Sequence, residues 1–254
     1  RIFKFHDQLT QAISENPPSV LALSNYIWNL EISYKLSAWA KRQDSNLVVV
    51  FGGPNFPIDK DEKLLFLQQR PVIDFYIENE GEIGFAGLLT KFEEYNFDIT
   101  AFKRSQEPVA NCTYVNGDEL IEGKIARIKD VNIISSPYLT GILDEFFELP
   151  LSPIIETTRG CPFSCTFCAD GLVSKNKVVA FTTDRVRDEL YYMVERVKNI
   201  DEIYISDLNF GMYKRDLETA QIISKIQSEF NWPARIKATT GKNMPKRMIQ
   251  IAEE

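Results

Sequence analysis

The sequence PIIETTRGCPFSCTFCADG, residues 153–171, joins a short apolar run to a loop with three cysteines. Residues 153–158 are apolar and β-branched, which predicts a buried strand. A glycine and a proline then favour a bend over a helix or strand. One loop at the end of a strand thus offers three thiolates, and cysteine thiolates are the usual ligands of iron–sulfur clusters. The three are Cys161, Cys165 and Cys168.

The spacing of the cysteines favours a [4Fe–4S] cluster with one open iron over a zinc site. Spacers of three and two residues let one turn of irregular backbone wrap three corners of a cluster. Structural zinc is the alternative, but it needs four protein ligands, commonly in two separated pairs. His6 and Cys112 are the remaining residues of these types, and both lie far away in the sequence. Three neighbouring cysteines suit a disulfide poorly.

Strands and helices alternate three times from the cysteine loop onward. This order is typical of a parallel sheet or barrel with right-handed crossovers. Barrels carry their chemistry at the C-terminal ends of the strands, where the cysteine loop, residues 206–211 and residues 239–243 fall. The expected elements are a strand over 153–158, a helix over 184–198 with Thr183 as N-cap, a strand over 202–206, a helix over 217–230, a strand over 234–239 and a helix from Pro245.

The N-terminal part has the pattern of a doubly wound α/β sheet. Such sheets bind ligands at the carboxyl ends of their strands. The segments to inspect are therefore 24–29, 52–57 and 78–82, and neither common nucleotide fingerprint is present in them. The expected strands are 20–24, 47–51 and 72–77, and the expected helices are 31–42, 59–70 and 82–95.

The cysteine loop, with Phe167 before Cys168, resembles the C-x3-C-x-aromatic-C signature of radical S-adenosylmethionine (radical SAM) enzymes. The resemblance implies that the three cysteines hold a [4Fe–4S] cluster, that SAM chelates its open iron and that Phe167 lies beside the adenine. Many members carry a Gly-Gly-Glu motif on the second strand. This sequence departs from it, and Asp207 and Asn209 resemble the variant of the cobalamin-dependent members, which implies contacts with SAM. A simpler alternative is that Asp207 caps the following loop.

The N-terminal part is similar to the cobalamin-binding domain of B12-dependent radical SAM proteins. The similarity rests on a serine after one strand, a Gly-Gly after the next and an acidic stretch before the last helix. It implies cobalamin contacts from Ser24, Asn25, Tyr26, Gly52, Gly53, Pro54, Glu80, Gly81 and Glu82. The family's D-x-H-x-x-G loop is not in this chain, since His6 lacks the flanking Asp and Gly. Either a strand precedes Arg1, or cobalamin binds without a histidine ligand.

This resemblance implies an α/β protein of two domains. We expect a Rossmann-like, flavodoxin-like cobalamin-binding domain over 1–105 and the first three units of a radical SAM barrel over 152–254. Between them, 106–151 is expected to be a linker with a β-hairpin at Asn116-Gly117, because Asn-Gly suits a type I′ turn. The chain begins with Arg1 and ends inside an expected helix, so we also expect it to be part of a longer protein that carries the first strand.

The function implied is that of a cobalamin-dependent radical SAM enzyme. Reductive cleavage of SAM would give a 5'-deoxyadenosyl radical, most commonly for methyl transfer to an unactivated carbon. Such an enzyme takes a small-molecule or natural-product-type substrate and an electron donor such as flavodoxin or ferredoxin. Two alternatives stay open. The N-terminal domain binds a substrate or partner instead of B12, or the protein is not a catalyst and has a structural zinc site.

Composition excludes other classes of function. The 254 residues are 44% hydrophobic, enough for two cores, and their net charge of −7 argues against nucleic acid as a partner. No apolar stretch approaches the ~20 residues of a membrane helix, and there is no secretory signal. An oxygen-labile cluster implies a reducing cytoplasm.

Overall fold

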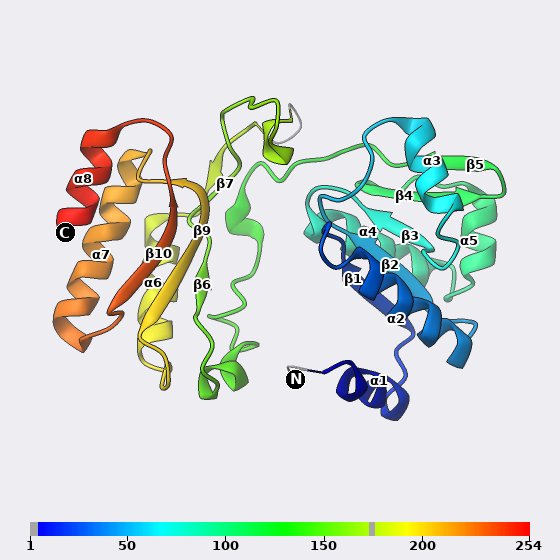
Figure 1. Ribbon diagram of the computed structural model, residues 1–254, viewed down its shortest axis with the longest axis horizontal. Helices are drawn as coiled ribbons and strands as arrows, with labels where there is room; N and C mark the ends of the chain where they lie inside the picture. The colour runs from blue at the N-terminus through cyan, green and yellow to red at the C-terminus, as the bar shows by residue number, and fades with distance from the viewer. Residues whose placement is uncertain (1–4, 173–175) are drawn as a thin grey trace. The chain divides into compact units, whose positions relative to one another are not determined.

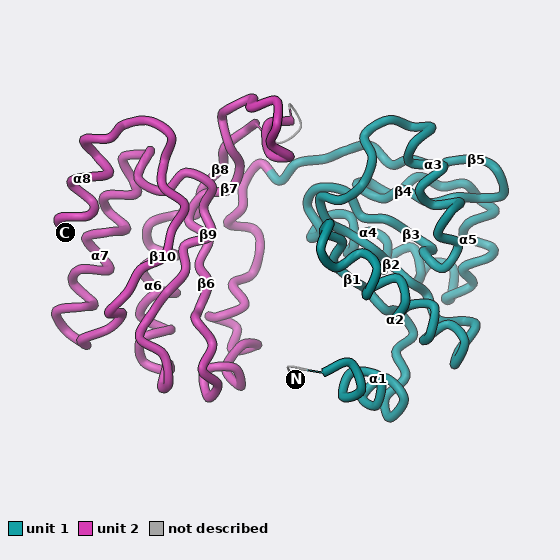
Figure 2. Tube along the Cα trace, in the orientation of Figure 1, with its two compact units in different colours: residues 1–128 teal, residues 129–254 magenta. Residues whose placement is uncertain are grey.

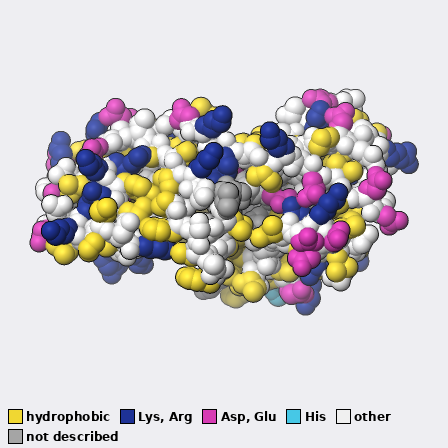
Figure 3. All heavy atoms as spheres, turned by 90° about the horizontal axis from the view of Figure 1, so that it is seen from above, with side chains coloured by type: hydrophobic (Ala, Val, Ile, Leu, Met, Phe, Trp, Pro, Cys, Tyr) yellow, Lys and Arg dark blue, Asp and Glu magenta, His cyan; other side chains and the backbone are white. Residues whose placement is uncertain are grey.

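The computed structural model describes residues 5–172 and 176–254. The chain forms two compact units, residues 1–128 and 129–254, each with its own sheet (Figures 1 and 2). In the face seen in Figure 3, each unit carries Lys and Arg as well as Asp and Glu side chains. No helix of the described residues is both long enough and apolar enough to cross a membrane.

The first unit is a five-stranded sheet in the order β1-β2-β3-β4-β5. The first three strands are parallel, β4 pairs antiparallel with β3, and β5 pairs antiparallel with β4. The strands are β1 (Val20–Ser24), β2 (Val48–Gly52), β3 (Phe75–Ile77), β4 (Cys112–Asn116) and β5 (Glu119–Glu122). The helices are α1 (His6–Glu15), α2 (Leu30–Gln43), α3 (Lys60–Gln68), α4 (Gly81–Glu94) and α5 (Ile99–Ser105).

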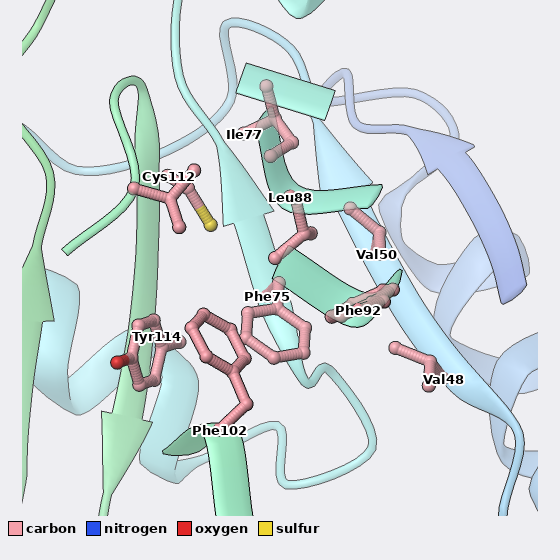
Figure 4. Packing of buried hydrophobic residues seen from close by; sticks show 10 residues of the cluster. Val48, Val50, Phe75, Ile77, Leu88, Phe92, Phe102, Cys112 and Tyr114 are labelled. Atoms are coloured by element: carbon pink, nitrogen blue, oxygen red, sulfur yellow. The ribbon is translucent and has the colours of Figure 1, made fainter. Parts of the chain in front are cut away.

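Both faces of this sheet are buried, so β2 is apolar along most of its length. On one face, Val48 and Val50 pack with Phe75, with Phe92 of α4 and with Phe102 of α5 (Figure 4). The other core cluster contains Val49, Phe51 and Tyr76 together with Ala40 of α2 and Leu67 of α3. This two-sided burial explains why β2 is a continuous apolar run, as in other parallel sheets.

The structure differs from the expected domain boundaries at the hairpin. We expected it in a linker over 106–151, whereas β4 pairs with β3 and extends the first sheet. The reason is visible in β4, because Cys112 and Tyr114 are buried against Phe75 and Phe102. The first compact unit consequently reaches Ile128.

The second unit contains the three expected β/α steps. Its main sheet has the order β10-β9-β6, and both strand pairs are parallel. The order β6 (Ile154–Ile155), α6 (Thr183–Val194), β9 (Glu202–Phe210), α7 (Lys214–Phe230), β10 (Arg235–Thr240) and α8 (Pro245–Glu253) confirms the predicted alternation. Short 3-10 helices lie at Val131–Ile133, Asp144–Glu148 and Ala169–Gly171.

Three local predictions in this unit were wrong. The strand expected over 153–158 is split, because β7 (Thr158–Arg159) leaves the main sheet and pairs antiparallel with β8 (Val179–Ala180). The N-cap of α6 is Thr182, whose hydroxyl accepts the Arg185 N–H at 3.3 Å. Strand β9 continues beyond 206 to Phe210, so the polar residues expected in a loop lie on the strand.

Candidate functional site

The cysteine loop lies between β7 and β8, and its three thiols are free. Cys161 is buried, Cys165 is half-buried and Cys168 is exposed. The backbone folds into tight turns, since Cys168 N–H donates to Cys165 O at 3.2 Å and Gly171 N–H donates to Cys168 O at 3.0 Å. A Cβ at Gly171 would lie 2.3 Å from Cys165 O, so this turn accepts only glycine there.

An amide on β9 contacts the buried cysteine directly. Asn209 Nδ2 donates to Cys161 Sγ at 3.3 Å, and Lys242 Nζ donates to Asn209 Oδ1 at 3.0 Å. Lys242 also lies 5.5 Å from the centre of the Phe163 ring in the cysteine loop. The structure thus brings Asn209 to the cysteine loop and adds Lys242, which we had not predicted. The Phe167 side chain is 92% exposed.

Asp207 holds the backbone that leads into the cysteine loop. Its carboxylate is 3% exposed and accepts the Thr157 N–H at 2.7 Å and the Thr157 hydroxyl at 2.5 Å. Burial raises the pKa of Asp207 to about 6, although the hydrogen bonds from Thr157 act in the opposite direction. These contacts are explained by a structural role of Asp207, which is close to the loop-capping role considered above. Contact of Asp207 with SAM stays a prediction.

Buried hydroxyls without a partner lie around the same loop. Among the described residues, the hydroxyls of Thr158 and Tyr213 are buried and make no hydrogen bond. Burial, together with the neighbouring Cys161 thiol, raises the pKa of Tyr213. Tyr213 also lines a cavity of about 700 Å³ at the start of α6 and α7. Unpaired buried polar atoms are uncommon and are expected where a bound group completes the site.

The donor chemistry of the loop fits an iron–sulfur cluster. Three free thiols come from one loop, and the most buried one already accepts a hydrogen bond, as cluster sulfurs commonly do. In the described part of the chain, no three or more His, Cys, Asp and Glu side chains are grouped so that they could hold a single metal ion.

A second cavity lies at the carboxyl ends of β1, β2 and β3 in the first unit. It measures about 340 Å³, and its lining includes four of the nine residues predicted for cobalamin, namely Ser24, Gly52, Gly53 and Gly81. Asn79 and Phe85 also line it, and sequence reasoning missed both. Asn79 has a φ of 58°, which lies in the left-handed region where asparagine is enriched. The sequence around Asn79 does not indicate this backbone conformation.

Two of the other predicted residues are engaged inside the protein. The Asn25 amide is fully buried and donates to Asn55 O at 2.6 Å and to the Tyr76 hydroxyl at 2.9 Å. Glu80 is 7% exposed, pairs with Arg127 at 3.1 Å and accepts the Ile128 N–H. These contacts support the fold, and contacts of Asn25 and Glu80 with cobalamin stay a prediction.

The remaining predicted residues lie outside the cavity lining. Pro54 and Glu82 are exposed, and Tyr26 stacks on Trp28 with ring centres 4.6 Å apart. None of the three is among the residues that line the 340 Å³ cavity. Contacts of Tyr26, Pro54 and Glu82 with cobalamin therefore stay a prediction from the family resemblance.

Gly53 shapes this cavity through its backbone. Its φ is +122°, and a Cβ there would lie 2.7 Å from Asn25 O. Gly81 differs, because a Cβ there would meet nothing within 4 Å. The Gly-Gly pair is thus explained in part by close approach of two loops, whereas Gly81 borders open space.

Comparison with known proteins gives one consistent group. No protein-family model matches the chain. The chain is 31% identical over 243 residues to the cobalamin-dependent radical SAM methyltransferase TokK of Streptomyces tokunonensis, covering 93% of this chain and 34% of that protein. It is 30% identical over 243 residues to the 2-(S-pantetheinyl)-carbapenam-3-carboxylate methyltransferase of Streptantibioticus cattleyicolor, with the same coverage of 93% and 34%. The chain spans about a third of the length of these curated relatives.

Solved structures give the same fold. The cobalamin-dependent SAM radical enzyme OxsB, with aqua-cobalamin and SAM bound, matches 98% of this chain and 35% of its own at a TM-score of 0.63 and 17% identity. The radical SAM methyltransferase TsrM from Kitasatospora setae, with cobalamin and a [4Fe–4S] cluster bound, matches 89% of this chain and 45% of its own. Its TM-score is 0.60 at 13% identity.

Proposed function

Because the chain belongs to the family of radical SAM proteins that carry a cobalamin-binding domain, we propose that it binds a [4Fe–4S] cluster, SAM and cobalamin. We further propose the activity of a B12-dependent radical SAM methyltransferase. The observation that carries this proposal is the set of three free thiols in one loop, with the buried one held by Asn209.

Cys161, Cys165 and Cys168 would hold the cluster. When bound and reduced, the cluster would supply the electron for cleavage of SAM, and the resulting 5'-deoxyadenosyl radical would remove a hydrogen from the substrate. Within the protein, Asp207 holds Thr157 ahead of the loop, and Asn209 donates to Cys161. The exposed ring of Phe167 is free to lie beside the adenine, and Asp207 and Asn209 are proposed to border SAM.

The nucleotide tail of cobalamin is proposed to occupy the cavity at the strand ends of the first unit. Ser24, Gly52, Gly53 and Gly81 would contact it, since all four line that cavity. The methyl acceptor is proposed to be an unactivated carbon of a small, natural-product-type molecule, and flavodoxin or ferredoxin to be the electron donor. An oxygen-labile cluster further requires a reducing compartment such as the cytoplasm.

The test is SAM cleavage by the anaerobically reconstituted, dithionite-reduced protein. We expect methionine and 5'-deoxyadenosine in equal amounts from the wild type and none from Cys165→Ala. Cys112→Ala is the matched control, because it removes a cysteine from the core of the first unit and leaves the loop intact. Equal product from the wild type and Cys165→Ala, or none from the wild type, would refute the proposal.

A further inference from the structure

We propose that Asn209 and Lys242 act as a relay that sets the reduction potential of the cluster, by controlling a hydrogen bond to the Cys161 sulfur. This inference rests on the proposed function, because it requires a cluster on the cysteine loop. It gives both residues a positioning role that is separate from contact with SAM.

The Asn209 amide donates a hydrogen bond to a buried sulfur. Asn209 Nδ2 lies 3.3 Å from Cys161 Sγ, and Asn209 is 3% exposed while Cys161 is 4% exposed. Water therefore has little access to compete with this bond. Reduction of a cluster adds negative charge to its sulfurs, so a donor aimed at a ligand sulfur stabilises the reduced form more than the oxidised form. Hydrogen bonds to the sulfurs and exposure to solvent are among the factors that set cluster potentials.

Lys242 decides which end of the Asn209 amide faces the sulfur. A lysine ammonium has three donors and no acceptor, so its partner at 3.0 Å must be the amide oxygen. With Oδ1 held by Lys242, Nδ2 is left pointing at Cys161. The reverse orientation would place two donors against each other at Lys242 and an oxygen lone pair against the thiolate, and both contacts are unfavourable.

Lys242 also brings a positive charge. Among the described residues, no ion pair is found for its ammonium, which lies 5.5 Å from the centre of the Phe163 ring. Its charge polarises the amide, which makes Nδ2 a stronger donor to Cys161. The Asn209 amide, near the end of β9, thus links the exposed ammonium of Lys242, which follows β10, to the buried sulfur of Cys161.

The test is the midpoint potential of the cluster, measured by redox titration followed by electron paramagnetic resonance in the absence of SAM and substrate. For Asn209→Leu, which nearly keeps the size and removes the donor without adding a charge, we expect the ratio of reduced to oxidised cluster at the wild-type midpoint to fall by roughly three- to tenfold. A tenfold fall corresponds to a shift of ~59 mV toward more negative potential for one electron. Lys242→Met should shift the potential in the same direction by a smaller amount, and Lys242→Arg should retain the wild-type value.

Lys237→Met is the control for net charge. It removes a lysine from β10, the strand that precedes Lys242, where Lys237 Nζ pairs with Glu202 at 2.8 Å rather than with Asn209, and the potential should not move. Iron and sulfide content must match the wild type in each variant compared. If Asn209→Leu fails to assemble a cluster, the Met and Arg variants of the exposed Lys242 decide the test. Unchanged potentials in cluster-loaded variants overturn this inference alone, whereas a wild type without a cluster overturns the proposed function.

Discussion

Asp207 is a buried carboxylate whose ionisation costs folding free energy. Burial raises its pKa from 3.8 to about 6, so the folded protein binds this proton more tightly than the unfolded chain. The stabilising contribution is therefore complete below pH 4 and is lost as the pH rises through 6. At about 1.4 kcal/mol for each pH unit between the two pKa values, the loss is up to ~3 kcal/mol.

We expect Asp207→Asn to remove this part of the pH dependence. The measurement is the free energy of unfolding in urea for the metal-free wild type and variant between pH 4 and pH 7. The wild type should lose stability relative to the variant across this range. Parallel curves would mean that the Asp207 carboxyl titrates alike in the folded and unfolded chain.

Asp207 and Asn209 also show how much of this site could be predicted from the sequence. Their types were predicted to matter, but they were placed in a loop, because Asp and Asn are depleted in strands. The available signal was the alternation of period two, since Ile203, Ile205, Asp207 and Asn209 are all buried on one side of β9. Lys242 carried no such signal, because an exposed lysine is ordinarily a solvated side chain.

At the scale of elements, the loop after β2 requires glycine for its own packing. Gly53→Ala would force a side chain into a backbone conformation with φ of +122° and into contact with Asn25 O at 2.7 Å. We expect the free energy of unfolding of this variant, measured in urea, to be lower than that of the wild type by about 1–3 kcal/mol. A variant as stable as the wild type would show that this loop shifts without cost.

A substitution at Gly81, the first residue of α4, can test cobalamin binding without disturbing folding. Gly81 lines the 340 Å³ cavity, and an added Cβ there meets no protein atom within 4 Å. Gly81→Ala should keep or raise the melting temperature, because alanine favours a helix by up to ~1 kcal/mol over glycine. Its dissociation constant for hydroxocobalamin should rise several-fold in equilibrium dialysis. Wild-type affinity would place cobalamin away from this residue.

The hairpin was predicted in the right region, but its turn was placed one residue too early and it was assigned to a linker. Asn116 is the last residue of β4 and pairs with Glu119, so the turn consists of Gly117-Asp118. The place of the hairpin beside β3 depends on contacts of Cys112 and Tyr114 with residues far away in sequence. Local pattern does not encode such pairing, whereas the order of strands and helices follows from periodicity alone.

At the scale of the molecule, each unit has its own core, and Glu80 joins the end of the first unit to α4. The pair between Glu80 and Arg127 is largely buried, with side chains 7% and 18% exposed. Removing one partner of such a pair typically costs ~3–5 kcal/mol. Arg127→Ala should therefore speed amide hydrogen exchange in residues 109–128 and leave the second unit unchanged. Lys124→Ala, which removes an exposed positive charge nearby, should change neither unit.

The central claim is that the cysteine loop carries a cluster that responds to SAM. Its most direct test is the electron paramagnetic resonance spectrum of the anaerobically reconstituted, dithionite-reduced protein, recorded with and without SAM and repeated for Cys165→Ala. We predict a reduced-cluster signal in the wild type that shifts when SAM is added and is lost in the variant. A silent spectrum from protein that holds one zinc ion per chain would contradict the account.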